Sequence, residues 1–379
     1  MAKRTFIIFF SIVLSLYTLI NYYIFVSGWN VVINYPAFKT PYLITFLVLS
    51  VSFIAGRFLE RVFLNKFTSF LVWIGSFWLA AMVYYFLFIV LLDLFRLINL
   101  FISFQINPQI NLLAGLIIST IVLLFVVIGY FNAIHPRINK INITINKKSS
   151  LSSLTIAAAS DIHLGTIISK SRLNRIVDKI NSINADIVLF PGDIVDEDVG
   201  PVIKHNLGEI LRKIRSKYGV FGITGNHEYI GGAEKACTYL VEHGIKMLRD
   251  EYVKIDDSFY IIGREDRSIR GFTGKLRKPL IDIIEGIDKS LPIIMMDHQP
   301  VKLNEAVESG VDLQLSGHTH HGQLFPFNFI TKKVYELSRG YIKKGNTQFY
   351  VSCGAGTWGP PIRTNNRPEI LELRISFKL

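Results

Sequence analysis

Four long apolar runs in the first third of the chain constrain its fold more than any other feature. We place them near Phe6–Val26, Tyr42–Phe58, Phe70–Leu92 and Leu112–Phe131. Each is long enough to cross a hydrocarbon layer of ~30 Å at ~1.5 Å per residue, although the second is close to the lower limit. The helices of a soluble bundle would show a polar stripe, and these apolar runs do not. We therefore disfavour a soluble bundle. The pattern predicts a multi-pass, four-helix transmembrane domain over residues 1–132.

Basic residues concentrate on one side of these runs. That side carries Lys3, Arg4, Arg57, Arg61, Lys66, Arg137, Lys140, Lys147 and Lys148. The opposite side carries only Lys39 and Arg96. Because basic loops tend to stay in the cytoplasm, we expect an inner or cell membrane protein whose N-terminus and C-terminal region are both cytoplasmic.

Asp93 and Arg96 are two charges three residues apart at the end of the third run. An intramembrane ion pair can mark a transport path. Two charges are thin support for a transporter, so we favour a helix-end pair at the lipid surface.

Composition narrows the classes of partner. The formal net charge of +12 is compatible with nucleic acid, anionic lipid or a phosphorylated substrate. Aromatic residues do not interleave with the charges, so we do not expect nucleic acid binding. The two cysteines, Cys237 and Cys353, show neither metal-site spacing nor a disulfide framework. This suits a reducing compartment.

A polar segment rich in Asn, Lys and Ser separates the membrane domain from the rest. We predict a linker over residues 133–153, part of which alternates Ile with polar residues and can form an edge strand. The second domain is then expected over residues 154–379.

The second domain repeats a pattern of apolar run, polar loop and helix. Five runs are predicted as buried strands: Leu154–Ser160, Asp186–Phe190, Tyr218–Thr224, Leu291–Met296 and Val311–Leu315. An amphipathic helix is expected over Ser171–Asn184, and a second helix over Val202–Ser216. The pattern predicts an α/β domain, in which ligands bind beyond the carboxyl ends of the strands.

Polar side chains follow each predicted strand at that end. They are Asp161, His163, Asp193, Asn226, His298, His318 and His320. Imidazole and carboxylate groups are common ligands of transition metals. Each motif alone is ordinary, and an acidic turn would explain Asp193 if it stood by itself. Together, with one or two after each strand, they predict a metal site.

Three residues near these motifs have distinct expected roles. The carboxylate of Asp193 can hold two cations with its two oxygens. Asp196 is expected to orient a neighbouring side chain. His227 directly follows Asn226, so it should point elsewhere and be free for acid–base chemistry.

The order Asp-x-His, Gly-Asp-x-x-Asp, Gly-Asn-His-Glu, a lone His and Gly-His-Thr-His resembles the calcineurin-like metallophosphoesterase superfamily. The resemblance covers about Leu154 to Leu379. It implies two packed mixed β-sheets flanked by helices, two metal ions, and His227 as the catalytic histidine. One metal would take Asp161, His163, Asp193 and His320, and the other would take Asp193, Asn226, His298 and His318.

A finer resemblance is to a bacterial membrane-associated branch of this superfamily. It is carried by Gly-Gln after the histidine motif and by the tail Gly354–Arg363. That branch includes hydrolases of UDP-diacylglucosamine in lipid A synthesis and proteins of unassigned substrate. His321 stands where glycine is usual, and it is either a substrate contact or an exposed side chain.

A basic cluster lies between two predicted strands. It consists of Arg264, Arg267, Arg270, Lys275, Arg277 and Lys278, interrupted by Glu265 and Asp266. It is either a clamp on an anionic substrate or lipid headgroup, or a solvated loop. On the first interpretation, we predict that Arg264, Arg267 and His321 bind the substrate.

The sequence therefore predicts a membrane-anchored, dinuclear-metal-dependent phosphoesterase. It would hydrolyse a phosphodiester or pyrophosphate bond, with Mn²⁺, Fe²⁺ or Zn²⁺ as cofactors and a membrane-associated or lipid-linked substrate. The alternative is a non-catalytic metal-binding sensor, scaffold or regulator coupled to the membrane domain, which loss of a ligand residue would have favoured. A metal-gated transporter would need more polar residues within the apolar runs.

Overall fold

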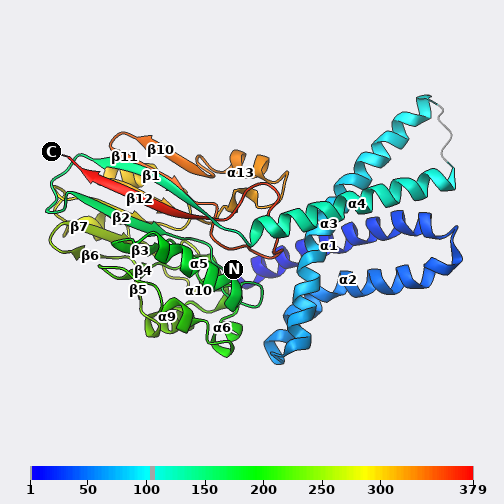
Figure 1. Cartoon of the computed structure of the whole chain (residues 1–379), viewed down its shortest axis with the longest axis horizontal. Coiled ribbons are helices and arrows are strands. Elements are labelled where there is room, and N and C mark those ends of the chain that lie inside the picture. The colour runs from blue at the N-terminus through cyan, green and yellow to red at the C-terminus, as the bar shows by residue number, and fades with distance from the viewer. Residues whose placement is uncertain (1, 103–106, 379) are drawn as a thin grey trace. The chain divides into compact units, whose positions relative to one another are not determined.

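The computed structural model describes residues 2–102 and 107–378. The chain divides into two compact units, one of residues 1–130 with 359–362, and one of residues 131–358 with 363–379 (Figure 1). Met1 and Leu379, at the outer ends of the two predicted domains, lie outside the described residues.

The first unit is built from four helices, all long and apolar enough to cross a membrane. They are α1 (Ala2–Val32), α2 (Pro36–Val62), α3 (Lys66–Ile102) and α4 (Pro108–Ala133). The prediction of four long apolar helices is confirmed, and each helix extends beyond the predicted apolar run at both ends.

Helices α2 and α3 approach each other closely at two glycines. A Cβ atom on Gly75 would lie 2.3 Å from the backbone nitrogen of Phe53. A Cβ on Gly56 would lie 2.7 Å from the backbone nitrogen of Val72. Without an apolar driving force in lipid, such small residues let helices gain van der Waals contact.

The ion pair between Asp93 and Arg96 joins three helices. The carboxylate lies 2.9 Å from the guanidinium and accepts a hydrogen bond from the Tyr23 hydroxyl at 2.5 Å. Arg96 also donates to the side-chain oxygen of Asn111 at 2.7 Å. Helix α3 continues to Ile102, so the pair lies within the helix and not at its end.

The second unit contains two six-stranded sheets. The first has the order β1 (Arg137–Ile145), β12 (Glu369–Phe377), β2 (Ser153–Ala158), β3 (Ile187–Phe190), β4 (Val220–Gly222) and β5 (Ile245–Met247). The second has the order β10 (Gly340–Lys344), β11 (Thr347–Val351), β9 (Leu313–Ser316), β8 (Ile293–Met296), β7 (Phe259–Gly263) and β6 (Glu251–Ile255).

Both sheets are mixed, and each has a parallel centre. Strands β2 to β5 run parallel, as do β7, β8, β9 and β11. Strand β12 is antiparallel to β2 but parallel to β1, and β6 and β10 are antiparallel edges. The predicted fold of two mixed sheets is confirmed.

The two sheets pack face to face around one apolar core. The first sheet contributes Ile156, Leu189 and Leu373, and the second contributes Ile294 and Leu315. Strand β3 is buried along its whole length, as expected for a parallel strand covered on both faces.

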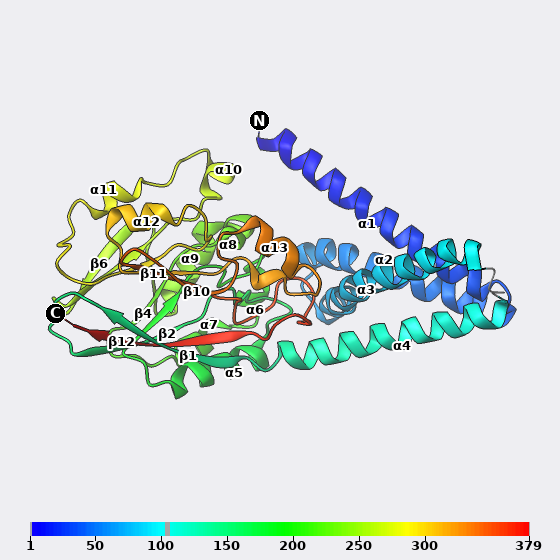
Figure 2. The same ribbon diagram turned by 90° about the horizontal axis from the view of Figure 1, so that it is seen from above.

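Helices cover the outer faces of the sheets, with α5 on one side and α11 and α12 on the other (Figure 2). The helices of this unit are α5 (Lys170–Ser182), α6 (Gly200–Lys204), α7 (Gly208–Leu211), α8 (Asn226–Gly231), α9 (Ala233–Glu242), α10 (Ile269–Thr273), α11 (Leu280–Ile284), α12 (Asn304–Ser309), the 3₁₀ turn η1 (His320–Gly322) and α13 (Asn328–Val334). The single helix predicted over Val202–Ser216 is wrong, because the chain turns at Asn206, whose φ is +48°, and forms α6 and α7 instead.

Part of the segment predicted as a linker belongs to the first sheet. Strand β1 pairs with β12 over its full length, from Arg137 opposite Glu369 to Ile145 opposite Phe377. Ile143 and Ile145 lie in the apolar core, so the alternating isoleucines mark a half-buried edge strand.

Replacing Leu373 by Ala should destabilise this unit by about 2–5 kcal/mol, because a fully buried side chain would leave a cavity between the sheets. Thermal unfolding of the purified full chain measures the effect. The matched control is Arg374→Ala on the same strand. Arg374 is exposed, and its partner Glu372 keeps Lys140 at 3.4 Å, so we expect a loss of about 0–1 kcal/mol. Equal losses for both variants would contradict the burial of this face of β12.

Candidate metal centre

The parallel strands bring all seven predicted metal ligands to one edge of the domain. Asp161 and His163 follow β2, Asp193 follows β3, and Asn226 follows β4. His298 follows β8, and the turn with His318 and His320 follows β9. Parallel strands end at the same edge of a sheet, so side chains far apart in sequence meet there.

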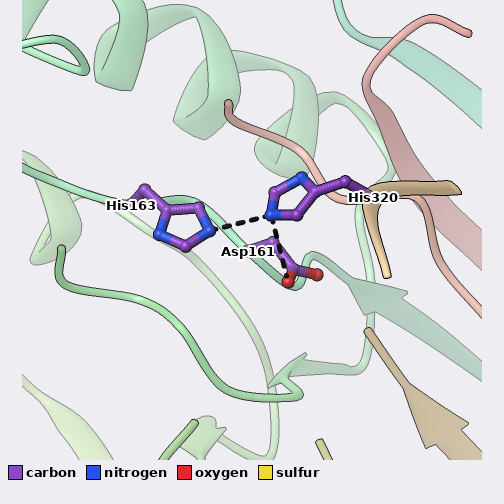
Figure 3. Close-up of side chains that lie close together, drawn as sticks. All are labelled: Asp161, His163 and His320. Carbon is purple, nitrogen blue, oxygen red and sulfur yellow. Dashed lines mark hydrogen bonds and ion pairs between the residues drawn. The ribbon is translucent and has the colours of Figure 1, made fainter. Parts of the chain in front are cut away.

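The first group consists of Asp161, His163 and His320, which point toward one another (Figure 3). The Nε2 atoms of His163 and His320 are 3.0 Å apart. Nε2 of His320 lies 3.6 Å from Oδ1 of Asp161. All three side chains are buried.

The second group consists of Asn226, His298 and His318 with Asp193. Oδ1 of Asn226 lies 2.7 Å from Nδ1 of His318 and 3.3 Å from Nε2 of His298. Oδ2 of Asp193 lies 3.1 Å from Nε2 of His298 and 3.8 Å from Nε2 of His163. The same carboxylate oxygen therefore faces both groups.

These residues fit a pair of divalent cations. Two imidazole nitrogens face each other at 3.0 Å, as ligands of one cation would. Oδ2 of Asp161 is buried and accepts no hydrogen bond from residues 2–102 or 107–378. A mixed set of carboxylate, amide and imidazole donors suits Mn, Fe or Zn.

Charge around the centre favours the metal-binding forms of Asp193 and His320, whereas burial is outweighed at His298, where the charge of Asp193 raises the pKa well above its usual value. Burial would raise the pKa of Asp193, but His298, His227 and His163 hold it well below its usual range. Burial, followed by His163 and Arg363, lowers the pKa of His320. An ionised carboxylate and a neutral imidazole are the forms that bind cations.

Glu228 fixes the loop that carries Asp193. It is fully buried and accepts hydrogen bonds from the backbone N–H groups of Gly225 at 2.7 Å, Val195 at 2.8 Å and Asp193 at 3.1 Å. Burial and the charge of Asp193 raise the pKa of Glu228 to about 7. We did not predict this role. The sequence carried a signal for it, because a Glu at the third position of a helix, as in α8, can accept the backbone N–H of the residue before the helix, here Gly225.

Two glycines allow the ligand loops to approach one another. A Cβ on Gly225 would lie 2.1 Å from Oδ1 of Asp193. Gly192 has a φ of +84°, and a Cβ there would lie 2.5 Å from Nδ1 of His298. Any side chain at these positions would displace a ligand, since such contacts lie far inside van der Waals distance.

The ligands themselves occupy unusual backbone conformations. Asp161, His163, Asp193, His318 and His320 all have φ between +44° and +72°. Non-glycine residues rarely adopt this left-handed region, and clusters of such residues occur at functional sites.

His227 lies beside the centre, with its imidazole held by acidic residues. Its Nδ1 lies 3.2 Å from Oδ1 of Asp196 and 3.9 Å from Oε1 of Glu197. Burial opposes the charged form, but Asp193, Asp196 and Glu197 outweigh it and raise the pKa of His227 to about 9. Asp196 therefore lies where it can orient this imidazole.

Two further residues at the centre had no predicted role. The ring of Trp358 is half exposed and lies 5.7 Å from that of His227. The guanidinium of Arg363 is fully buried, with Nη2 3.0 Å from Nδ1 of His320 and 2.7 Å from the carbonyl oxygen of Gly356. Both lie in Gly354–Arg363, the segment on which the finer family resemblance rests. Neither directly follows a predicted strand, so a search for polar residues at strand ends did not identify them.

The predicted substrate-binding residues Arg264, Arg267 and His321 contact side chains and backbone groups other than the seven ligands. Arg264 is buried and donates to Asp250 at 3.2 Å. Arg267 donates to the carbonyl oxygen of Val301 at 3.2 Å and pairs with Glu305 at 3.7 Å. Nδ1 of His321 lies 3.1 Å from the Ser338 hydroxyl. Groups of the protein itself thus engage all three side chains.

Several known proteins are similar to this chain over about two thirds of its length. The family model described as calcineurin-like phosphoesterase matches residues 154–322. An uncharacterized metallophosphoesterase of Helicobacter pylori strain J99 is 35% identical, covering 65% of this chain and 66% of that protein. One of Aquifex aeolicus is 30% identical, covering 64% and 92%. A Danio rerio protein named transmembrane protein with metallophosphoesterase domain is 31% identical, covering 68% and 61%.

The two mixed sheets carry aspartate and histidine side chains gathered at their strand ends, within the region that the family model matches. With the match to the Aquifex relative over nearly its whole length, the chain belongs to the calcineurin-like metallophosphoesterase family. The aligned region spans slightly less than two thirds of the Helicobacter and Danio proteins.

Replacing Asp193 by Asn should remove bound metal, because its Oδ2 faces both groups of ligands. We expect a loss of affinity greater than the roughly 10–100-fold that loss of a supporting partner costs. Metal content of the purified chain, measured by mass spectrometry, tests this. The control is Asp198→Asn in the same loop, since Asp198 caps only the N–H of Gly200 at 2.8 Å. Unchanged metal content in the Asp193 variant would show that the centre does not bind cations there.

Replacing His227 by Asn should leave the metal content unchanged but lower turnover of a chromogenic phosphodiester by about 10²–10⁴-fold, the usual contribution of a general acid. His227 also lies within ligand distance of His163 and Asp193, so the two readouts separate an acid from a ligand. Loss of metal together with activity would assign His227 to the ligand set.

Proposed function

We propose that this protein is a membrane-anchored phosphoesterase that uses two divalent cations to hydrolyse a phosphodiester or pyrophosphate bond. The observation that carries this is the position of Asp193, whose Oδ2 faces His298 at 3.1 Å and His163 at 3.8 Å. Family membership and four helices long enough to cross a membrane support it.

The residues divide into two ligand sets that share Asp193. One cation would be held by Asp161, His163, Asp193 and His320, and the other by Asp193, Asn226, His298 and His318. Bound Mn²⁺, Fe²⁺ or Zn²⁺ would supply Lewis acidity for the phosphoryl oxygens and lower the pKa of water.

His227 would protonate the leaving oxygen. Its contact with Asp196 at 3.2 Å orients the ring, and the acidic surroundings favour the protonated form at neutral pH. Cations on Asp193 would offset the negative charge of that carboxylate, so Asp196 and Glu197 would then be the partners that keep the imidazole protonated. The half-exposed ring of Trp358 beside His227 can cover an apolar part of the leaving group.

We further propose that the domain faces the cytoplasm and acts on a membrane-associated or lipid-linked substrate. The basic residues Arg57 and Arg61 in the last turns of α2, Lys66 at the start of α3 and those after α4 support this orientation. A single helix is enough to anchor a domain to a membrane, whereas this chain has four helices of membrane length. The additional helices support a substrate that is delivered within the membrane. A non-catalytic sensor is less well supported, because every predicted ligand is present and the seven converge.

Incubating the purified full chain with a membrane lipid extract and Mn²⁺ should deplete a phosphate-containing lipid and release a phosphorylated fragment. Lipid mass spectrometry identifies both species. Asp193→Asn should deplete nothing, and Asp198→Asn should match the unmodified chain. Turnover of a chromogenic phosphodiester without any change in the extract would exclude a lipid substrate but keep the phosphoesterase. Inactivity on both, with metal bound, would favour the sensor.

A further inference from the structure

An exposed apolar segment directly follows the histidine turn of the metal centre. In Leu324–Val334, the side chains of Phe325, Phe327, Phe329, Ile330 and Val334 are between 38% and 65% exposed. Single exposed apolar residues are ordinary on a protein surface, but a contiguous group marks a contact with another apolar phase. Lys332 and Lys333 on the same short helix, α13, are also exposed.

This segment is a fixed part of the fold. A Cβ on Gly322 would lie 2.4 Å from the backbone nitrogen of Asn328, so the segment packs back on the histidine turn. The backbone N–H of Phe325 donates to the Thr364 hydroxyl at 2.9 Å. Asn365 and Asn366 donate to the carbonyl oxygens of His321 and His320, each at 2.8 Å. The exposed side chains are therefore held in place beside the centre.

A basic cavity of about 550 Å³ adjoins the segment through these same residues. Thr364, Asn365 and Asn366 line it. Its charged side chains are Arg137, Arg339, Arg367 and the buried carboxylate of Glu369. Glu369 lies 3.7 Å from Arg339, which leaves an excess of positive charge that suits a phosphate group.

The position of the cavity along the chain favours a lipid over a soluble phosphate. Asn132 lines it and accepts a hydrogen bond from Arg367 at 3.0 Å. Asn132 is the last residue but one of α4, a helix long and apolar enough to cross a membrane. Where such a helix spans a bilayer, chain connectivity alone keeps a site within a turn of its end close to the lipid headgroups.

We propose that this face, formed by Leu324–Val334 and the basic cavity, docks on an anionic phospholipid leaflet. The aromatic and aliphatic side chains enter the interface, and the arginines bind headgroup phosphate. Interfacial segments bind through apolar area together with attraction to anionic lipid. A soluble phosphate would account for the cavity but not for five exposed apolar side chains, and a second copy of the chain would account for the side chains but not for the arginines. The proposal concerns membrane contact and does not depend on catalysis.

The test places a fluorophore on the segment in the full chain, reconstituted in bilayers with nitroxide-labelled lipid. Phe329→Cys and Ile330→Cys carry the label, and Ile281→Cys on α11 is the control because it is equally exposed and lies away from α13 within the domain (Figure 2). The native Cys237 and Cys353 are buried. We expect several-fold stronger quenching at 329 and 330 than at 281 in bilayers containing phosphatidylglycerol. Equal quenching at all three positions would overturn the proposal.

The contribution of the cavity is tested in the same bilayers. The double variant Arg137→Gln/Arg367→Gln should reduce quenching at 329 several-fold, as should replacing phosphatidylglycerol by phosphatidylcholine. Lys140→Gln/Lys148→Gln removes the same charge from exposed positions on β1 and just after it, leaves Glu372 paired with Arg374 at 2.6 Å, and should change little. The proposal would be contradicted if quenching were the same in both lipids and also the same with and without the two arginines. Loss of quenching on adding inorganic phosphate alone would also contradict the proposal and would assign the cavity to a soluble anion. Energy transfer between labelled chains would contradict it as well and would assign the face to a second copy of the chain.

Discussion

The carboxylate of Asp193 is the interaction on which the centre depends. Its Oδ2 faces His163 on one side and His298 on the other, while its Oδ1 accepts the backbone N–H of His227 at 2.9 Å. One side chain therefore ties together both ligand groups and the backbone of the candidate acid. The position of that carboxylate follows from β3, which is buried along its length and cannot shift without disturbing the core between the sheets.

Backbone strain and buried hydrogen bonds balance each other around this carboxylate. Five ligands have left-handed φ values, each of which is costly for a residue with a side chain. Glu228 offsets part of this cost by accepting three backbone N–H groups from the loops on either side. Asp161 does the same for the histidine turn by accepting the N–H of His318 at 2.8 Å. The loops are thereby held in their strained conformations, with the ligand side chains already gathered at one place.

The sequence allowed the membrane helices and the strand ends to be predicted because both signals are local. Apolar length alone marks a membrane helix, and a polar residue after a buried run marks a strand end. The helix break at Asn206 was missed, since a left-handed residue is not visible in apolar periodicity. The contact between Arg363 and His320 joins residues 43 apart in sequence, and no local pattern specifies which side chain will reach across. The exposure of Phe329 was equally unpredictable, because an aromatic residue in a short helix normally indicates core.

The pairing of β1 with β12 has a consequence for how this chain is made. Strand β12 lies between β1 and β2, so the first sheet joins residues 137–145 to residues 369–377. These partners are separated by nearly the whole domain, and β12 is synthesised after all the other described strands of both sheets. Until then β2 lacks a neighbour on one side and the core between the sheets is open. The first sheet is therefore completed only after the second sheet has been synthesised.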